Sequence, residues 1–582
     1  MGRGREQSIV PAQIPSMPPT PSSPEPSPGA QRSTTTWILV FGFVAVAGIL
    51  IGLYYNTGGM LSDTEAAQRL IGLQFSRAKV DSMQEGLKEQ LASYEKIRQI
   101  HLANNVPPAF QFNPIPPGMK LESVRRTLRM SPPPRVSVPP NLDDLAFSTI
   151  GELSQLIQTR KVTSEQLTAM YLNRLKKYGP KLECVITLTE SLAFAQAKRA
   201  DAEIRRGVYR GPLQGIPYGA KDLLATKGIL TTWGSVPFKE QKFDEDATVI
   251  KRLEQAGAVL VAKLTMGELA WGDVWFGGMT RNPWDYKQGS SGSSAGSASA
   301  TAAGLVGFAI GTETWGSIVS PSTRCGVTGL RPTYGRVSRT GAMALSWSMD
   351  KIGPICRTVE DCAIVLNAIC GPDGKDQTLY DVPFNYDPKI NLHDLRIGFL
   401  KTAFDSVKGD HANNDAALAK LRELGATLIP IELPRYPMND LSIILSAEAG
   451  AAFDDLTRSG RDDLLVRQVK DAWPNVFRLS RFIPAVEYIQ ANRIRYEVIQ
   501  DMARLMDDVD VYVAPPFEGD NLLLTNLTGH PQVVLPNGFS KEGTPTSITF
   551  VGRLFDEGTL VAVAKKYQDA TDFHLKHPRL LE

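Results

Sequence analysis

The sequence predicts an α/β fold, in which helices cover a central β-sheet, from two patterns and their order. Residues 163–166 (Thr-Ser-Glu-Gln) match a capping box, and the apolar residues that follow recur at helical spacing. Residues 259–262 (Val-Leu-Val-Ala) and 511–514 (Val-Tyr-Val-Ala) are short apolar runs typical of buried strands. Such patterns alternate from about Leu142 onward, and this order is typical of a covered sheet.

The composition of the chain limits its partners. With 582 residues, 42% of them hydrophobic, it allows roughly two to four domains, or one large domain with an N-terminal appendage. Its 63 basic and 61 acidic residues give a net charge of +2, so we expect no nucleic-acid partner. The five cysteines fit neither a disulfide framework nor a zinc site, and we predict neither a metal nor a cofactor.

The first 55 residues differ in composition from the rest. Residues 1–36 are rich in Pro, Ser and Thr and are predicted to be a disordered tail. Residues 37–55 carry no charge and match the length that crosses a bilayer core of about 30 Å, so we predict a transmembrane anchor there. A buried helix is the alternative. A cleaved signal peptide is disfavoured, because its small-residue cleavage site at residues 45–48 lies inside the apolar run.

Charges beside the predicted anchor give its orientation. Arg32 and Arg69 nearly balance across the span, and Arg3 and Arg5 add positive charge on the N-terminal side. The positive-inside rule then predicts a single-pass membrane protein with its tail in the cytoplasm. The bulk of the chain, with any catalytic domain in it, is expected on the extracytoplasmic side.

Residues 56–141 are expected to hold N-terminal helices and a proline-rich connector. An apolar stripe at helical spacing consists of Met83, Leu87, Leu91, Tyr94 and Ile97. A helix that packs on its own domain is favoured over a coiled-coil stalk, because the heptads do not persist. Proline runs between residues 107 and 134 indicate an extended connector on the surface, after which the globular body is expected to span residues 142–578.

Two glycine- and serine-rich loops lie close together in the middle of the chain. Residues 289–297 read Gly-Ser-Ser-Gly-Ser-Ser-Ala-Gly-Ser, and residues 311–317 read Gly-Thr-Glu-Thr-Trp-Gly-Ser. Glycine lets a backbone approach a ligand closely, so each loop can present a serine hydroxyl beside N–H groups, as serine hydrolases require. A flexible linker is the alternative. The apolar run at residues 305–310 indicates a buried strand between the loops and argues against a linker.

The loops alone do not identify the base that would activate a serine. None of the six histidines lies in a motif resembling them, which weakens a Ser-His-Asp triad without excluding it. Residues 292–296 also fit the G-x-S-x-G pattern of a nucleophile elbow centred on Ser294. Such an elbow follows a strand, whereas residues 282–289 are polar and turn-like, so an α/β-hydrolase is disfavoured.

Several motifs in this order resemble those of the amidase signature enzymes. The similar segments are residues 215–222, 292–297, 311–318, 325–338, 349–354, 527–531 and 552–557. Residues 215–222 (Gly-Ile-Pro-Tyr-Gly-Ala-Lys-Asp) look like the segment that carries the family's lysine. The resemblance covers about residues 142–578, an amidase domain, and implies the amidase-signature fold: a large mixed sheet covered by helices on both faces.

The resemblance implies a Ser-Ser-Lys triad that works through an acyl-enzyme. Ser317 would be the nucleophile, Ser293 the bridging serine after a cis peptide bond, and Lys221 the base. The family places its serines 24 residues apart, as Ser293 and Ser317 are here, which selects Ser293 over Ser294 and leaves Ser294 without a role. The implied oxyanion hole consists of the backbone N–H groups of Thr314, Trp315, Gly316 and Ser317.

A lysine in water titrates near 10.4, so Lys221 needs a pKa lowered by about three units to act as a base near neutrality. Burial lowers a lysine pKa, and Tyr218, Leu223 and Leu224 flank Lys221 in sequence. A surface lysine is the alternative for Lys221 taken alone. Trp315 stands where many family members have glycine, and one hypothesis is that it narrows the acyl side of the pocket.

The resemblance implies an amidase acting on a small or linear amide, with ester or carbamate hydrolysis as side activities. One alternative is a glutamine-hydrolysing A-type subunit of glutamyl-tRNA(Gln) amidotransferase, which is disfavoured because that subunit's arginine motif has no counterpart in residues 447–458. Another is a catalytically inactive, membrane-tethered binding protein of the same fold. Retention of all three triad candidates argues against it. The sequence identifies neither the substrate nor the oligomeric state.

Overall fold

The computed structural model describes residues 61–132, 136–407 and 411–580, and the chain divides into two compact units, residues 1–96 and 97–582. The first unit contributes most of helix α2 (Arg77–Arg98), which lies where the apolar stripe predicts a helix. Val80 is the buried residue of α2, whereas Leu91, Tyr94 and Ile97 are exposed. The stripe is therefore helical but does not pack as expected.

The predicted membrane anchor is wrong for the structure as described. Among the described residues no helix is long and apolar enough to cross a bilayer, which needs about 20 largely apolar residues. The two longest described helices, α2 with 22 residues and α15 (Ala485–Asp508) with 24, carry charged side chains along their length. Residues 37–55, like the predicted tail at residues 1–36, lie outside the described residues. The predictions of a single-pass topology and of an extracytoplasmic domain depended on this anchor, and they lose their support with it.

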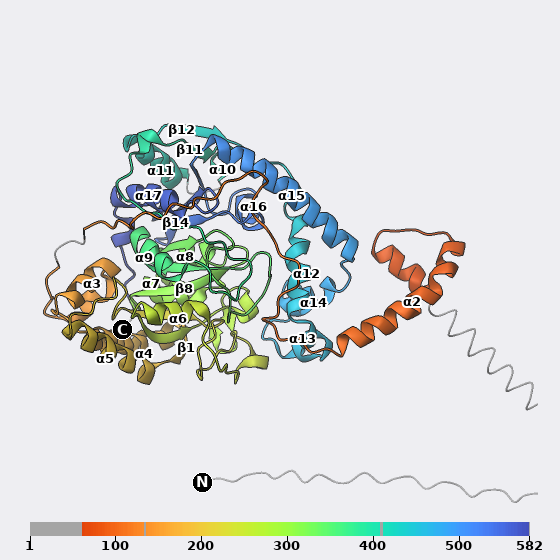
Figure 1. Cartoon of the computed structure of the whole chain (residues 1–582), viewed down its shortest axis with the longest axis horizontal. Helices are drawn as coiled ribbons and strands as arrows, with labels where there is room; N and C mark the ends of the chain where they lie inside the picture. The colour runs from red at the N-terminus through yellow and green to blue at the C-terminus, as the bar shows by residue number, and fades with distance from the viewer. Residues whose placement is uncertain (1–60, 133–135, 408–410, 581–582) are drawn as a thin grey trace, which may run out of the picture. The chain divides into compact units, whose positions relative to one another are not determined.

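The second unit is built around one large mixed β-sheet (Figure 1). In the described residues the sheet has 11 strands, in the order β1-β3-β2-β8-β10-β9-β14-β15-β13-β11-β12. In that order, their bounds are Val185–Leu188, Val259–Leu264, Pro217–Lys221, Phe308–Glu313, Lys351–Cys356, Thr328–Arg331, Gln532–Phe539, Pro545–Gly552, Val511–Ala514, Ile397–Leu400 and Leu428–Ile431. The apolar runs at residues 259–262 and 511–514 fall in the fully buried strands β3 and β13, as predicted.

Parallel and antiparallel pairings alternate in blocks across this sheet. Strand β2 runs parallel to β3 and β8, and β11 runs parallel to β12 and β13. The strands between β8 and β13 pair antiparallel with their neighbours. The predicted α/β fold with a large mixed sheet is confirmed.

Helices cover both faces of the sheet. The evidence is that neighbouring residues of one strand belong to different core clusters. In β3, Leu260 packs in the largest cluster with residues of α3 and α9, whereas Val259 and Val261 pack in another cluster with residues of α5. Successive residues of a strand point to opposite faces, so each cluster lies on its own face. These helices span Ile150–Gln158 (α3), Val359–Ile369 (α9) and Glu190–Arg205 (α5).

The remaining helices lie between strands along the chain, in places as runs of several consecutive helices. Helix α4 (Ser164–Leu182) begins at the predicted capping box, in which Thr163 and Gln166 each accept a hydrogen bond from the other's backbone N–H. The others are α6 (Thr248–Gln255), α7 (Ala295–Ala302), α8 (Val319–Cys325), α10 (Lys401–Ser406), α11 (His411–Glu423), α12 (Ile443–Ala452), α13 (Asp454–Arg458), α14 (Trp473–Ser480), α16 (Asn521–Thr528) and α17 (Glu557–Asp569).

Part of the proline-rich connector, residues 104–113, packs on the rest of the second unit, and we call it the strap. Asn104 anchors one end: its amide nitrogen donates to the carbonyls of Ala344 (2.9 Å) and Ala452 (3.2 Å), and its oxygen accepts from Ala344 N at 2.7 Å. At the other end the Phe112 ring meets Tyr334 edge-on, with ring centres 5.0 Å apart. The compact unit accordingly begins at Ile97, ahead of the strap, whereas the sequence pattern starts near Leu142.

Candidate active site

Lys221 ends strand β2 inside the sheet and is fully buried. Its Nζ atom lies 2.8 Å from Ser293 Oγ, 2.9 Å from Thr312 Oγ1 and 3.1 Å from Ser294 Oγ. Because β2 is parallel to β8, the ends of both strands meet at one edge of the sheet, and Thr312 comes from that end of β8. The topology therefore brings the lysine to both serine loops.

Burial lowers the pKa of Lys221 from 10.5 to about 7. The negative charges of Asp350 and Glu313 act in the opposite direction, raising the pKa, but do not offset the loss of hydration. At neutral pH a large share of this amine is therefore uncharged. A neutral amine carries a lone pair and can accept a proton, so the site supplies a base without a histidine.

Ser293 follows a cis peptide bond from Gly292, as the resemblance implies. A Cβ atom on Gly292 would lie 1.8 Å from the carbonyl oxygen of Gly272, so only glycine fits at this position. The Ser293 carbonyl accepts a hydrogen bond from Gly267 N at 3.3 Å. The loop is thus held on both sides of Ser293, with the hydroxyl turned toward Lys221.

Ser294, which the sequence leaves without a role, fixes the orientation of the lysine. Its hydroxyl donates to the Thr312 carbonyl at 3.0 Å and accepts from Thr312 N at 3.1 Å. Since its one proton is used, Ser294 can only accept from Lys221. A neutral amine has two protons and one lone pair, so with Ser294 and Thr312 as acceptors the lone pair points at Ser293.

The preceding strand that a nucleophile elbow requires does exist, but it lies outside the main sheet. Residues 285–289 form β7 (Asp285–Gly289), which pairs with β6 (Arg281–Asn282) in a two-stranded ribbon. Another such ribbon joins β4 (Val274–Trp275) and β5 (Gly278–Met279). Ser294 consequently does not stand at the end of a central strand, in contrast to an α/β-hydrolase nucleophile.

Ser317 lies in a turn that a buried carboxylate holds in place. Glu313 Oε2 accepts from the N–H groups of Ile318 (2.8 Å) and Val319 (2.9 Å), at the start of α8. Its other oxygen pairs with Arg331 at 2.7 Å and accepts from the Asn526 amide at 2.9 Å. Burial raises the pKa of Glu313, but Arg331 and the hydrogen bonds outweigh it and hold the pKa below its ordinary value. The turn therefore rests on a charged, fully partnered group.

The turns of Ser317 and Ser294 are joined by a hydrogen bond from Ser294 N to the Ser317 carbonyl at 3.2 Å. Gly316 has a φ of +86°, in the left-handed region that favours glycine. Within the described structure the N–H groups of Trp315, Gly316 and Ser317 donate no hydrogen bond to the chain. They are available to an oxyanion, and the hole formed with Thr314 stays a prediction.

Trp315 is 39% exposed, and it does not line the cavity beside Lys221. That cavity has a volume of about 560 Å³ and begins at Thr312 and Thr314. Nothing in the arrangement supports a Trp315 side chain that narrows it. Much of the cavity wall is instead formed by residues of the loop 339–347 and of the strap.

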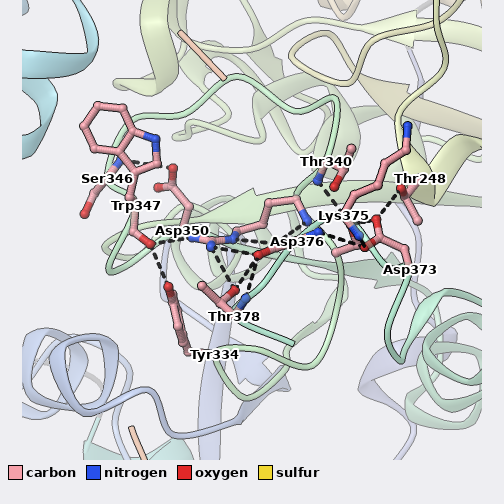
Figure 2. Close-up of polar contacts among 12 residues, drawn as sticks. Thr248, Tyr334, Thr340, Ser346, Trp347, Asp350, Asp373, Lys375, Asp376 and Thr378 are labelled. Carbon is pink, nitrogen blue, oxygen red and sulfur yellow. Dashed lines mark hydrogen bonds and ion pairs between the residues drawn. The ribbon is translucent and has the colours of Figure 1, made fainter. Parts of the chain in front are cut away.

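Asp350 connects the predicted oxyanion loop, residues 314–317, to this cavity. It accepts from Thr314 Oγ1 at 2.5 Å and from the N–H groups of Leu345 (2.8 Å) and Ser346 (3.0 Å). Figure 2 shows Asp350 beside Trp347, with Asp376 and Thr378 farther along the same group of polar side chains. Burial raises the pKa of Asp350, although these hydrogen bonds favour its charged form.

Sequence reasoning missed Thr312, Glu313 and Asp350. Thr312 and Glu313 lie in the glycine-rich segment before Ser317, and Asp350 lies in a segment similar to the amidase signature enzymes. Their positions in motifs were visible, but their partners come from segments far away in the chain. The one signal available in the sequence was a short polar residue, Thr312, near the end of an apolar run that predicts a buried strand.

The large mixed sheet, the serine after a cis peptide bond and the buried lysine are together the features expected of the class of C–N hydrolases that the sequence resembles. The family model described as Amidase matches residues 166–561, and the chain belongs to this family. The predicted amidase-signature fold is thereby confirmed.

Relatives of known description agree with this family. The A subunits of glutamyl-tRNA(Gln) amidotransferase from Acinetobacter baumannii and Halorhodospira halophila are each 35% identical to the chain, over 76% and 75% of it and 99% of the subunit. Among solved structures, the peptide amidase of Stenotrophomonas maltophilia matches with a TM-score of 0.68 and 30% identity, covering 75% of this chain and 99% of that one. The A subunit from Thermotoga maritima matches with a TM-score of 0.64 and 27% identity, over 75% and 99%.

Proposed function

We propose that the chain hydrolyses the C–N bond of a linear amide, with Ser317 as nucleophile, Ser293 as relay and Lys221 as base. The observation that carries the proposal is the 2.8 Å contact between Ser293 Oγ and a buried Lys221 whose pKa is lowered to about 7. A surface lysine at this place would stay protonated and could not accept the proton.

In the proposed reaction, Ser317 Oγ forms a bond to the carbonyl carbon. Its proton passes to Ser293, whose own proton passes to Lys221. The N–H groups of residues 314–317 stabilise the oxyanion of the tetrahedral intermediate. When the C–N bond breaks, the amine leaves with a proton from Ser293, which Lys221 restores. Water then attacks the acyl-enzyme through the same relay and releases the acid and free Ser317.

A panel of amides, anilides, esters and carbamates on the purified protein tests this proposal. We expect amide hydrolysis that falls by about 1,000-fold or more in Ser317→Ala and Lys221→Ala. Ser540→Ala, a serine in the hairpin turn between β14 and β15, is the matched control and keeps wild-type rates. Mass spectrometry of a slowly hydrolysed substrate should find the acyl group on the peptide with Ser317. Activity that survives Ser317→Ala would overturn the mechanism.

A second candidate is glutamine hydrolysis as the A-type subunit of an amidotransferase. The curated relatives support it more directly than the first candidate, because A subunits match at 35% identity over 99% of their length. The residues argue the other way: the arginine motif of the A subunits has no counterpart in the segment 447–458, whose one arginine, Arg458, pairs with Asp454 and Asp455.

Ammonia release from glutamine separates the two candidates. An A-type subunit would hydrolyse glutamine and respond to partner subunits added from an amidotransferase. The first candidate predicts that glutamine is a poor substrate compared with uncharged amides, with or without those partners. The inactive binding protein that the sequence left open is tested by the same panel, since it predicts no turnover at all.

A further inference from the structure

The cavity beside Lys221 is larger than the chemistry alone requires. Its volume of about 560 Å³ lies within the range of roughly 300–1,000 Å³ that drug-sized ligands occupy. It starts at Thr312, which lies 2.9 Å from Lys221 Nζ, and at Thr314 in the predicted oxyanion loop. Lys221, Ser293 and Ser317 do not themselves line the cavity, so it adjoins the site only through Thr312 and Thr314.

The walls next to the proposed reacting atoms are apolar. Leu223 follows Lys221 by two residues, and Ile352 is the strand partner of Thr312 in the sheet. Met343 and Leu345 complete this part of the wall, and all four side chains are buried. Such a surface gains free energy from contact with hydrocarbon at about 25 cal/mol per Å².

Most charged groups of the wall have partners within the chain. Arg339 donates to Asp376 (3.1 Å), to Thr378 (2.9 Å) and to the Trp347 carbonyl (2.5 Å). Lys375 pairs with Glu245 at 3.6 Å. Asp350 accepts three hydrogen bonds, as described above. Lys351 also lines the cavity; its amine donates to the Met349 carbonyl, and burial lowers its pKa well below the ordinary value. Trp347 Nε1 is a buried donor without a partner among the described residues, so the wall offers a neutral hydrogen-bond donor and no unpaired buried charge.

The roof of the cavity comes from the strap. Residues Asn105, Pro107, Pro108, Ala109 and Gln111 line it, whereas Phe110 points away and is 68% exposed. Asn104 ties the roof to Ala344 on the wall, and Gln111 donates to Gln377 at 3.0 Å at the polar end. The strap lies ahead of residues 166–561, where the family model matches.

We infer that this cavity is a substrate subsite for a bulky, uncharged and mainly apolar group on one side of the amide, and that the strap determines this specificity. The inference rests on the proposed amide hydrolysis. It names a substrate class that excludes glutamine, whose two charges would lie against apolar walls and paired ions.

Two matched substrate series on the full chain test the inference. One lengthens the acyl group of a p-nitroanilide from acetyl through hexanoyl to decanoyl, and the other lengthens the amine of an N-alkyl acetamide. In one of the two series we expect kcat/KM to rise by about 10-fold or more from the shortest to the longest substrate. We call this rise the gain, and it is what burial of a few methylene groups would produce.

Two neighbouring strap positions provide the variant and its control. Ala109→Trp places a large side chain in the roof and should reduce the gain to below about 3-fold. Phe110→Trp adds a similar side chain on the outer surface and should keep the full gain. Should Ala109→Trp not fold, Asn104→Ala releases the roof from Ala344 and should also reduce the gain.

Binding gives a readout that does not depend on turnover. In a Ser317→Ala background, calorimetry with the decanoyl anilide should detect binding that Ala109→Trp weakens by about 10-fold and Phe110→Trp does not. If short amides are hydrolysed but neither series shows a gain, the inference is overturned while the proposed function stands. If the gain is the same in both strap variants and in Asn104→Ala, the role of the strap is overturned. If no amide is hydrolysed, the proposed function fails, and the binding experiment still decides on the cavity.

Discussion

Among single residues, Lys221 depends most on its surroundings for its chemistry. Three hydroxyl groups lie within 3.1 Å of its amine, and none of them is charged. Burial removes the hydration of the ammonium ion, and this loss explains a lysine that titrates near neutrality.

The pH dependence of the proposed reaction follows from this lysine. The neutral amine is the active form, so kcat/KM for an uncharged amide should rise with pH through about 7 and then level off. Stopped or continuous assays between pH 5.5 and 9 measure the profile. A rate that is flat or falls between pH 6 and 8 would contradict the role given to Lys221.

The same pKa makes Lys221 a cost to stability. The folded pKa is about 7 and the unfolded pKa 10.5, so the unfolded chain binds the proton more tightly. The penalty is largest below pH 7, at about 5 kcal/mol, and disappears as pH rises through 10.5. Lys221→Met should therefore raise the free energy of unfolding at pH 7 by about 2 kcal/mol, once the lost hydrogen bonds are subtracted.

Urea unfolding of both proteins at pH 7 and pH 10 measures this difference, which should shrink or reverse at the higher pH. The variant should also lose amide hydrolysis. A Met variant that is less stable than wild type at pH 7, by the same margin as at pH 10, would contradict the argument.

The residues of the candidate site were predicted unevenly. Lys221, Ser293 and Ser317 were found through motif resemblance, because each stands in a short segment with a recognisable spacing. Ser294 was set aside by the same spacing. Its contacts with Thr312 and Lys221 depend on three segments that meet only in the folded sheet, and no local pattern encodes that meeting.

Among the elements, the turn between β8 and α8 is held by one carboxylate. Glu313 accepts hydrogen bonds from Ile318 and Val319 and pairs with a fully buried Arg331. Removing the charge leaves Arg331 without its counter-ion in the core. We expect Glu313→Gln to lower the free energy of unfolding by about 3 kcal/mol and to reduce kcat by displacing Ser317.

An exposed ion pair provides the control for this experiment. Glu254 pairs with Arg199 at 2.9 Å on the surface, and Glu254→Gln should change the free energy of unfolding by less than about 1 kcal/mol. Denaturant unfolding and steady-state kinetics of both variants test the prediction. Equal stability losses in the two variants would show that the buried pair does not hold the turn.

At the scale of the whole molecule, the α/β fold was predictable because its signals are local. A capping box and short apolar runs mark helix α4 and strands β3 and β13, and all three lie where the sequence indicates. The order of the 11 strands was not predictable from these signals. Pairings such as β9 with β14 join segments about 200 residues apart, and no short pattern specifies them.

The start of the folded unit leads to a prediction about truncated chains. A chain from Ile97 onward should unfold at the same temperature as the full chain, since the compact unit begins there. A chain from Leu142 onward loses the strap contacts of Asn104 and Phe112, and its Tm should fall by roughly 5 °C or more. Circular dichroism measures both. An unfolded chain from Ile97 would contradict the boundary.

The position of the strap has a consequence for how such enzymes diverge. The proposed catalytic groups lie within residues 166–561, where the family model matches, whereas the strap lies ahead of them. A duplicated gene that changed its strap would acquire new substrates with an unaltered catalytic core. Substrate range would then be inherited with the strap, and catalytic activity with residues 166–561.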